Sequence, residues 1–238
     1  MDRKTNLLEL TKEVAEKHAN FLVSEVNDHC MRIAVLEGEY VWHIHPGSDE
    51  LFIVLEGELL IDFQDRPTEV LKANDSLLIP KGVIHRTRAD VRSVNLCIEK
   101  TNAETVPFAE GNVLKLIRCK PAGQQLHAFS EAQAKWAPLQ NVSGFIRQWG
   151  GWMETEDGPE AVVLALWKSK HDYLNFMAEH HDEIYERTHQ KGTFESINIT
   201  LFEDPAEISE TLQNNTPAPV PEWTVMGSGR LRDPHSLS

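Results

Sequence analysis

The chain of 238 residues lacks several features that would assign it to large classes of protein. It has no apolar run of about 18 residues, so it contains no candidate transmembrane helix, and its first residues lack the apolar stretch of a signal peptide. Basic residues are outnumbered, with 23 Lys and Arg against 37 Asp and Glu, and they form no stripe. This balance disfavours nucleic acid and anionic membrane surfaces as partners.

Cysteine is also scarce. The three residues Cys30, Cys97 and Cys119 lie far apart in separate apolar runs. An odd number of isolated cysteines predicts buried free thiols in a reducing compartment rather than a disulfide framework. We therefore expect a cytoplasmic protein.

What the chain does have is a concentrated set of possible metal ligands. His43 and His45 are separated by one residue, so on a strand both side chains point to the same face, roughly 6.6 Å apart. Glu50 follows a turn-forming segment at 46–49, and His85 follows the turn sequence at 79–82. Three imidazoles and one carboxylate form a ligand set suited to a divalent transition metal ion: Fe, Mn, Ni, Cu or Zn.

This pattern resembles the two sequence motifs of the cupin superfamily. The first motif is met by Gly38, His43, His45, Glu50 and Gly57, and the second by Pro80, Gly82 and His85. Asn74 and Ala89 depart from the second motif, which expects Gly and Asn there, but neither position supplies a metal ligand. The resemblance implies an antiparallel β-barrel of the jelly-roll type with a metal ion held by His43, His45, Glu50 and His85.

The hydrophobic pattern predicts an α+β chain of two domains. Apolar residues at helical spacing predict a helix over 6–19, and short alternating runs from 22 to 100 predict the strands of the barrel. We place the first domain at 1–105, because the polar segment 101–111 ends this pattern. Residues 205–238 are rich in Pro, Asn and Ser and predict a poorly ordered or surface-wrapping tail.

Between these segments, residues 111–204 have a different pattern, in which apolar strands alternate with helices. Strands are expected at 113–119, 144–152, 161–167 and 193–202, with helices at 124–139 and 170–190. The order βαββαβ is that of a ferredoxin-like unit. It resembles the small domains of the antibiotic-biosynthesis-monooxygenase type, which pair into dimeric α+β barrels, and more specifically an uncharacterised bacterial family often encoded beside cupins.

Two further groups of side chains are candidates for ligand contact. Interior positions of the barrel strands that could contact a substrate are Val41, Phe52, Val54, Ile79 and Cys97. In the second domain, His181 is on the apolar face of the long helix, and with Gln148, Trp149 and Trp152 it could line a cleft between helix and sheet. For each of these residues, packing in the core is the favoured alternative.

The leading functional hypothesis is a metal-dependent enzyme, an oxidoreductase of the dioxygenase type acting on a small organic molecule, with Glu50 as a possible catalytic base. Two alternatives stay open: a non-catalytic metal- and ligand-binding or sensing protein whose second domain serves dimerisation, and a metal-dependent isomerase of a sugar or keto acid. Fold does not decide reaction class. Both domain types favour a homodimer.

Overall fold

The computed structural model describes residues 4–123, 125–215, 217 and 221–228. These residues form two compact units, one that ends at Phe108 and one that begins at Ala109. The division lies within the polar segment 101–111. Each unit has its own sheet and its own core, so the two are described separately.

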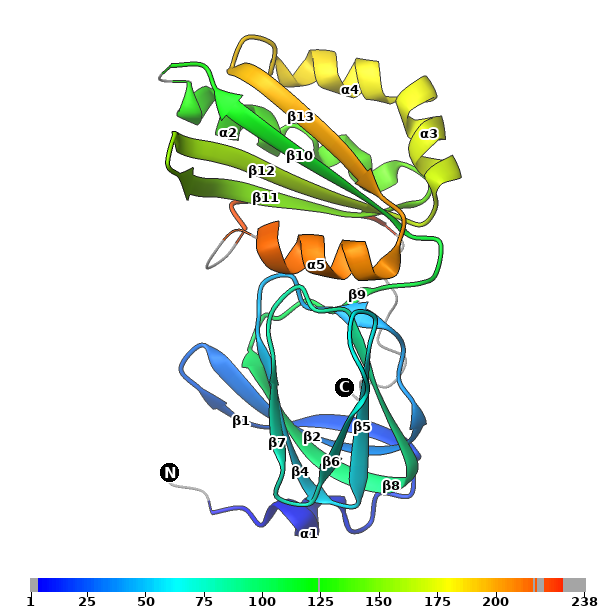
Figure 1. Cartoon of the computed structure of the whole chain (residues 1–238). Coiled ribbons are helices and arrows are strands. Elements are labelled where there is room, and N and C mark those ends of the chain that lie inside the picture. The colour runs from blue at the N-terminus through cyan, green and yellow to red at the C-terminus, as the bar shows by residue number, and fades with distance from the viewer. Residues whose placement is uncertain (1–3, 124, 216, 218–220, 229–238) are drawn as a thin grey trace. The chain divides into compact units, whose positions relative to one another are not determined.

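The first unit is a curled antiparallel sheet that forms a half-barrel (Figure 1). Its strands are β1 (His18–Val26), β2 (His29–Glu39), β3 (His43–Ile44), β4 (Glu50–Glu56), β5 (Glu58–Phe63), β6 (Glu69–Lys72), β7 (Ser76–Ile79), β8 (His85–Lys100) and β9 (Val106–Pro107). The long strand β8 pairs with β2, β3, β4 and β5 along its length. It therefore connects the parts of the sheet that carry the candidate ligands.

Side chains alternate between the two faces of the sheet, as the period of a strand requires. On β8, Val94 and Leu96 pack with Ile33 and Val35 of β2 in one apolar cluster. The intervening residues of β8, among them Cys97, face the concave side. The concave side thus carries polar positions such as Asn95 and Glu99 beside apolar ones such as Phe52.

Two turns require a left-handed backbone. Gly57, between β4 and β5, has a φ of +78°, and a Cβ there would lie 2.6 Å from the carbonyl oxygen of Arg92. Asn74 also has a φ of 78°. Asparagine tolerates this conformation better than most residues, which explains how it replaces the glycine of the motif.

The expected helix over 6–19 is much shorter in the structure. Helix α1 spans Leu7–Thr11, and the Asn6 side chain accepts hydrogen bonds from the backbone N–H groups of Leu8 and Glu9. His18 already belongs to β1, where it pairs with Leu36. The apolar pattern from Leu7 to Phe21 therefore covers two different elements, a short helix and the start of a strand.

The second unit is a five-stranded antiparallel sheet in the order β13-β10-β12-β11-β14. Its strands are β10 (Val113–Pro121), β11 (Phe145–Thr155), β12 (Gly158–Trp167), β13 (Phe194–Phe202) and β14 (Trp223–Met226), and its helices are α2 (Leu126–Ala134), the 3-10 helix η1 (Ala137–Asn141), α3 (Lys170–Glu179), α4 (His181–Thr188) and α5 (Pro205–Asn215). Helices α2, α3 and α4 cover one face of the sheet, and α5 lies on the other (Figure 1).

One expectation for this half is wrong, and another holds in one of its two forms. The single helix at 170–190 is divided at His180, whose φ of −129° ends α3 and begins α4. Of the tail expected to be poorly ordered or surface-wrapping, residues 205–215 and 223–226 pack on the sheet, because Ile208 and Leu212 of α5 are fully buried and β14 pairs with β11. Residues 216, 218–220 and 229–238 lie outside the described residues.

Candidate metal centre

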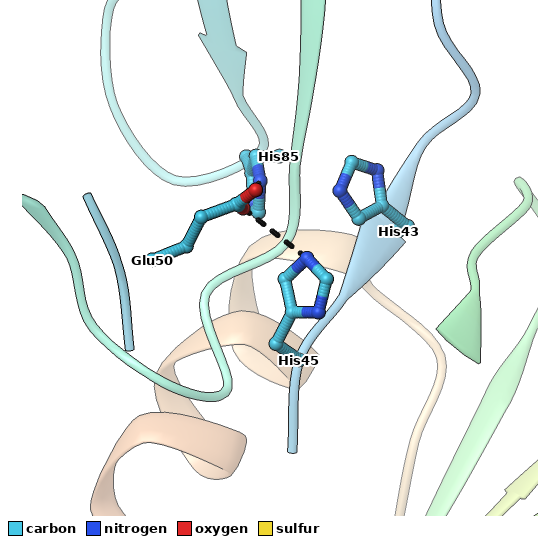
Figure 2. Close-up of side chains that lie close together, drawn as sticks. All are labelled: His43, His45, Glu50 and His85. Carbon is cyan, nitrogen blue, oxygen red and sulfur yellow. Dashed lines mark hydrogen bonds and ion pairs between the residues drawn. The ribbon is translucent and has the colours of Figure 1, made fainter. Parts of the chain in front are cut away.

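The ends of strands β3, β4 and β8 bring the candidate ligands together on the concave side of the first sheet. His43 is on β3 and pairs in register with His85, the first residue of β8. Glu50 is the first residue of β4, and His45 directly follows β3. One ligand atom from each residue lies within 4.8 Å of the others, and all four residues are buried. Figure 2 shows the Glu50 carboxylate close to the rings of His45 and His85, with His43 beside them.

The backbone fixes the orientation of the three imidazole rings. In each ring Nδ1 is within hydrogen-bond distance of a carbonyl oxygen: 2.8 Å from Val41 for His43, 3.0 Å from Glu104 for His45 and 3.1 Å from Val83 for His85. A carbonyl oxygen can only accept, so Nδ1 carries the proton and donates. The Nε2 atom of each neutral ring then presents a lone pair, which is the arrangement of a metal-binding histidine.

The Glu50 carboxylate completes a set of electron-pair donors with no proton between them. Its Oε2 atom lies 3.1 Å from His85 Nε2 and 3.2 Å from His45 Nε2. His45 Nε2 is buried and makes no hydrogen bond among the described residues. Lone pairs facing a carboxylate in a buried site repel one another unless a proton or a cation lies between them. The donor set therefore fits a divalent transition metal ion.

Sequence comparison agrees with this geometry. Residues 31–96 match the model of the cupin domain. The N-terminal part of the chain is a cupin domain. Residues 113–202 match a second model, described as a domain of unknown function (DUF4937). The protein is therefore a cupin domain followed by a domain to which no activity is attached.

Two curated proteins that this chain resembles are described as uncharacterized. The chain is 69% identical over 110 residues to the uncharacterized protein YdbB of Bacillus subtilis (strain 168), covering 46% of this chain and 97% of YdbB. It is 36% identical over 116 residues to the uncharacterized protein YdbC of the same strain, covering 48% and 98%. A solved cupin-2 domain protein from Shewanella frigidimarina is 34% identical, with 40% of this chain and 93% of that chain covered and a TM-score of 0.39.

The surroundings of His43, His45, Glu50 and His85, here called the cupin quartet, favour protonation states that can bind a cation. Burial, followed by the charges of His85 and His45, lowers the pKa of His43 well below its ordinary value. Burial would raise the pKa of Glu50, but His45 and His85 outweigh it and hold the pKa of the carboxyl well below its usual range. Burial also opposes the charge on His45, yet Glu50 raises the pKa of His45 overall. Glu50 is thus anionic and His43 neutral, as coordination requires.

Two further side chains of β8 adjoin the quartet. Cys97 Sγ donates a hydrogen bond to Glu50 Oε1 at 2.8 Å. Glu99 Oε2 lies 3.6 Å from His45 Nδ1 and has no hydrogen-bond partner among the described residues. Burial and the neighbouring Glu50 raise the pKa of Glu99 to about 7. Cys97 thus bonds Oε1 of Glu50, whereas the imidazoles of His45 and His85 lie near Oε2.

A cavity of about 310 Å³ adjoins the quartet on the concave side of the sheet. Its lining includes His43, His45 and Glu50. Several polar residues that the sequence analysis did not select also line it, among them Arg32, Asn95 and Glu99. Asn95 is 2% exposed, and its Oδ1 has no hydrogen-bond partner in the described part of the chain. The alternation of β2 and β8 was the signal that could have found these residues.

The sequence-selected substrate positions divide between cavity, core and surface. Phe52 and Cys97 line the cavity. Val54 and Ile79 are buried in the apolar core and are not among the lining residues. Val41 is 47% exposed, so the expectation of an interior position is wrong. It lies in the segment between β2 and β3, where its contribution to the site is the carbonyl that accepts from His43.

The cleft expected in the second domain is formed by two of its four proposed residues. Gln148 and His181 line a cavity of about 60 Å³ between the sheet and helices α2, α3 and α4. Trp149 is fully buried and does not line it. Trp152 packs against Phe129 and Trp223. Alternation along β11 explains the position of Trp149, because residues 148 and 149 face opposite sides of the sheet.

No helix among the described residues is long and apolar enough to cross a bilayer.

Proposed function

We propose that the cupin domain is a metal-dependent oxidoreductase of the dioxygenase type that acts on a small organic molecule. The observation that carries this proposal is the convergence of three Nε2 lone pairs and one carboxylate beside a cavity of about 310 Å³. A site that only stabilised the fold would not need adjoining space for a second molecule. A cavity of this size is at the lower end of the range found for small-molecule sites.

Each residue has a proposed role. His43, His45, Glu50 and His85 hold a divalent ion of Fe, Mn, Ni, Cu or Zn, which when bound would act as a Lewis acid with positions open to oxygen or substrate. Glu50 is also the proposed catalytic base. It is the one carboxylate among the four ligands, and a carboxylate oxygen that leaves the ion could accept a proton from the substrate. Around the cavity, the Arg32 guanidinium and the Asn95 amide are placed to orient a polar substrate.

The second domain is proposed to be of the ferredoxin-like type, on the strength of its order β13-β10-β12-β11. We further propose a homodimer. Ile197 and Ile199 on the edge strand β13 are 45% and 49% exposed, and such an edge is usually covered. Light scattering at micromolar concentration should give twice the mass of one chain, and a monomeric mass would contradict the dimer.

The test of the proposed activity combines metal analysis with oxygen uptake. Protein loaded with Fe(II) should consume oxygen with at least one compound of a panel of small aromatic and thiol substrates. Metal at one equivalent per chain without oxygen uptake across the panel would reject the dioxygenase. Turnover that persists without oxygen would favour an isomerase instead.

The variant Glu50→Gln separates an enzyme from a binding protein. Loss of turnover with metal retained favours the enzyme, because the amide keeps the shape of the carboxylate but cannot accept the proton. Loss of ligand affinity alone favours a binding or sensing protein. Thr68→Val is a suitable control, since Thr68 bonds Asp62 at 2.7 Å and is outside the cavity lining.

A further inference from the structure

The second domain contains a buried lysine that forms no ion pair with any of the described residues. Lys115 on β10 is 6% exposed. Among the described residues its Nζ has neither an ion-pair nor a hydrogen-bond partner, and its contact is the ring of Tyr173, 5.4 Å away. An unpaired ammonium is among the most costly groups to bury. Burial lowers the pKa of Lys115 to about 8, so the group is still mostly cationic at neutral pH.

Lys115 lines the cavity of about 60 Å³ together with other unsatisfied polar groups. Gln148 is placed near it by the sheet, since Ala165 of β12 pairs with Lys115 on one side and with Gln148 on the other. Gln133 of α2 approaches from the helical layer. Both glutamines are buried, and neither side-chain amide has a hydrogen-bond partner in the described chain.

The indole of Trp167 adds a fourth polar group to the same lining. Trp167 is 1% exposed, and its Nε1–H donates to no group of the described residues. The hydrogens of an ammonium, an indole N–H and two amide NH₂ groups outnumber the lone pairs of the two amide oxygens that could accept them. A ligand that satisfies them must therefore offer acceptor oxygens, and the charge of Lys115 favours an anion. The lining also includes His181, Tyr185 and Gln190, together with apolar side chains such as Val163 and Phe176.

The size of the cavity limits the ligand. A water-sized group needs about 10–15 Å³ of this volume, so about 60 Å³ accommodates roughly four non-hydrogen atoms. Acetate has four, and propionate five. The lining also includes Ile197 and Ile199 of the edge strand, both close to half exposed, which gives the ligand a route from solvent.

We propose that the second domain binds a monocarboxylate of two or three carbon atoms, with its carboxylate on Lys115 and the side-chain amides of Gln133 and Gln148 and its alkyl group against the apolar wall. This site is independent of the cupin quartet and of the activity proposed for it.

The test is titration of the full chain with acetate and propionate, followed by calorimetry and by line broadening of ¹³C-labelled acetate. The protein is treated with chelator first, so that a metal ion in the cupin domain does not bind the carboxylate. Chloride and acetamide serve as controls for charge alone and for shape alone. Saturable binding of the carboxylates at pH 7, much weaker for both controls, is the expected result.

Matched variants locate the site. Lys115→Met should weaken acetate binding at least tenfold, as loss of a charge-assisted hydrogen bond predicts. Lys120→Met, at an exposed position of the same strand, should leave it unchanged. If Lys115→Met does not fold, as judged by circular dichroism, Gln148→Leu takes its place and should weaken binding severalfold. Two results would overturn the proposal. One is no saturable binding up to 50 mM, and the other is an affinity for acetate in the Lys115 and Gln148 variants equal to that of the parent.

Discussion

His45 Nε2 lies 3.2 Å from Glu50 Oε2, while the other nitrogen of the same ring lies 3.0 Å from the carbonyl oxygen of Glu104. The imidazole has one proton when neutral, and the carbonyl can only accept. A neutral His45 therefore directs a lone pair at a carboxylate. A second proton relieves this repulsion, and Glu50 accordingly raises the pKa of His45. A divalent cation held by the four residues would relieve it as well.

Cys97 should hold Glu50 in its ligating position. The variant Cys97→Val lacks the thiol that donates to Glu50 Oε1. It should bind metal about tenfold more weakly, which is the lower end of the effect expected when a group that orients a ligand is lost. Cys97→Ser keeps a donor and should stay within a fewfold of the parent. Competition with a chromophoric chelator measures the affinities. Cys30→Val is the control, since Cys30 lines the same cavity without contacting Glu50; equal losses in both valine variants would assign the effect to packing.

Gly57 should be intolerant of a side chain. In Gly57→Ala the methyl group would meet the Arg92 carbonyl oxygen at 2.6 Å, in addition to the cost of a φ of +78° for alanine. We expect a loss of about 2–4 kcal/mol in stability. Gly111→Ala isolates the backbone term, because Gly111 has a φ of +87° and nothing within 4 Å. Calorimetric unfolding measures both, and similar losses would show that the close approach to Arg92 is unimportant.

Lys115 should make stability depend on pH in the alkaline range. The pKa of Lys115 is about 8 in the folded chain and near 10.5 when unfolded. Below pH 8 both states are protonated, and the full cost of burying the charge is present. Between about pH 8 and 10.5 the unfolded state binds more protons, so that cost is relieved as pH rises.

Lys115→Met should therefore stabilise the ligand-free protein at pH 7, by an amount on the order of 2–3 kcal/mol. The gain should shrink as the pH is raised from about 8 to 10.5. Thermal unfolding of parent and variant across this range measures it, with Lys120→Met as the exposed reference. A gain that is constant with pH would mean that the effect comes from packing and not from the charge.

The sequence predicted most about the metal centre because its ligands sit at fixed short spacings. His43 and His45 share a strand face, and Glu50 and His85 each begin a strand after a turn, so local rules bring them close. Arg32 and Asn95 were missed, although they alternate with core residues on β2 and β8. Their role depends on which face becomes concave, and this is set by pairing between strands distant in the sequence.

The second domain was predictable in its order of elements but not in its chemistry. Lys115 stands in the apolar run at 113–119, where a single charge is ordinarily directed to solvent. Only the stacking of three helices over that face encloses it. The tail was only partly predicted for a related reason: its composition is polar, but Ile208, Leu212 and Trp223 have specific positions against the sheet.

The most direct test of the central claim is the metal content of protein purified without chelator, determined by elemental analysis for the parent and for His45→Ala. His29→Ala is the control, because His29 is an exposed histidine of the same sheet. The account predicts one equivalent of a transition metal per chain in the parent and in His29→Ala, and little in His45→Ala. Equal metal content in all three proteins, or none in the parent after incubation with Fe(II), Mn(II), Ni(II), Cu(II) and Zn(II), would contradict it.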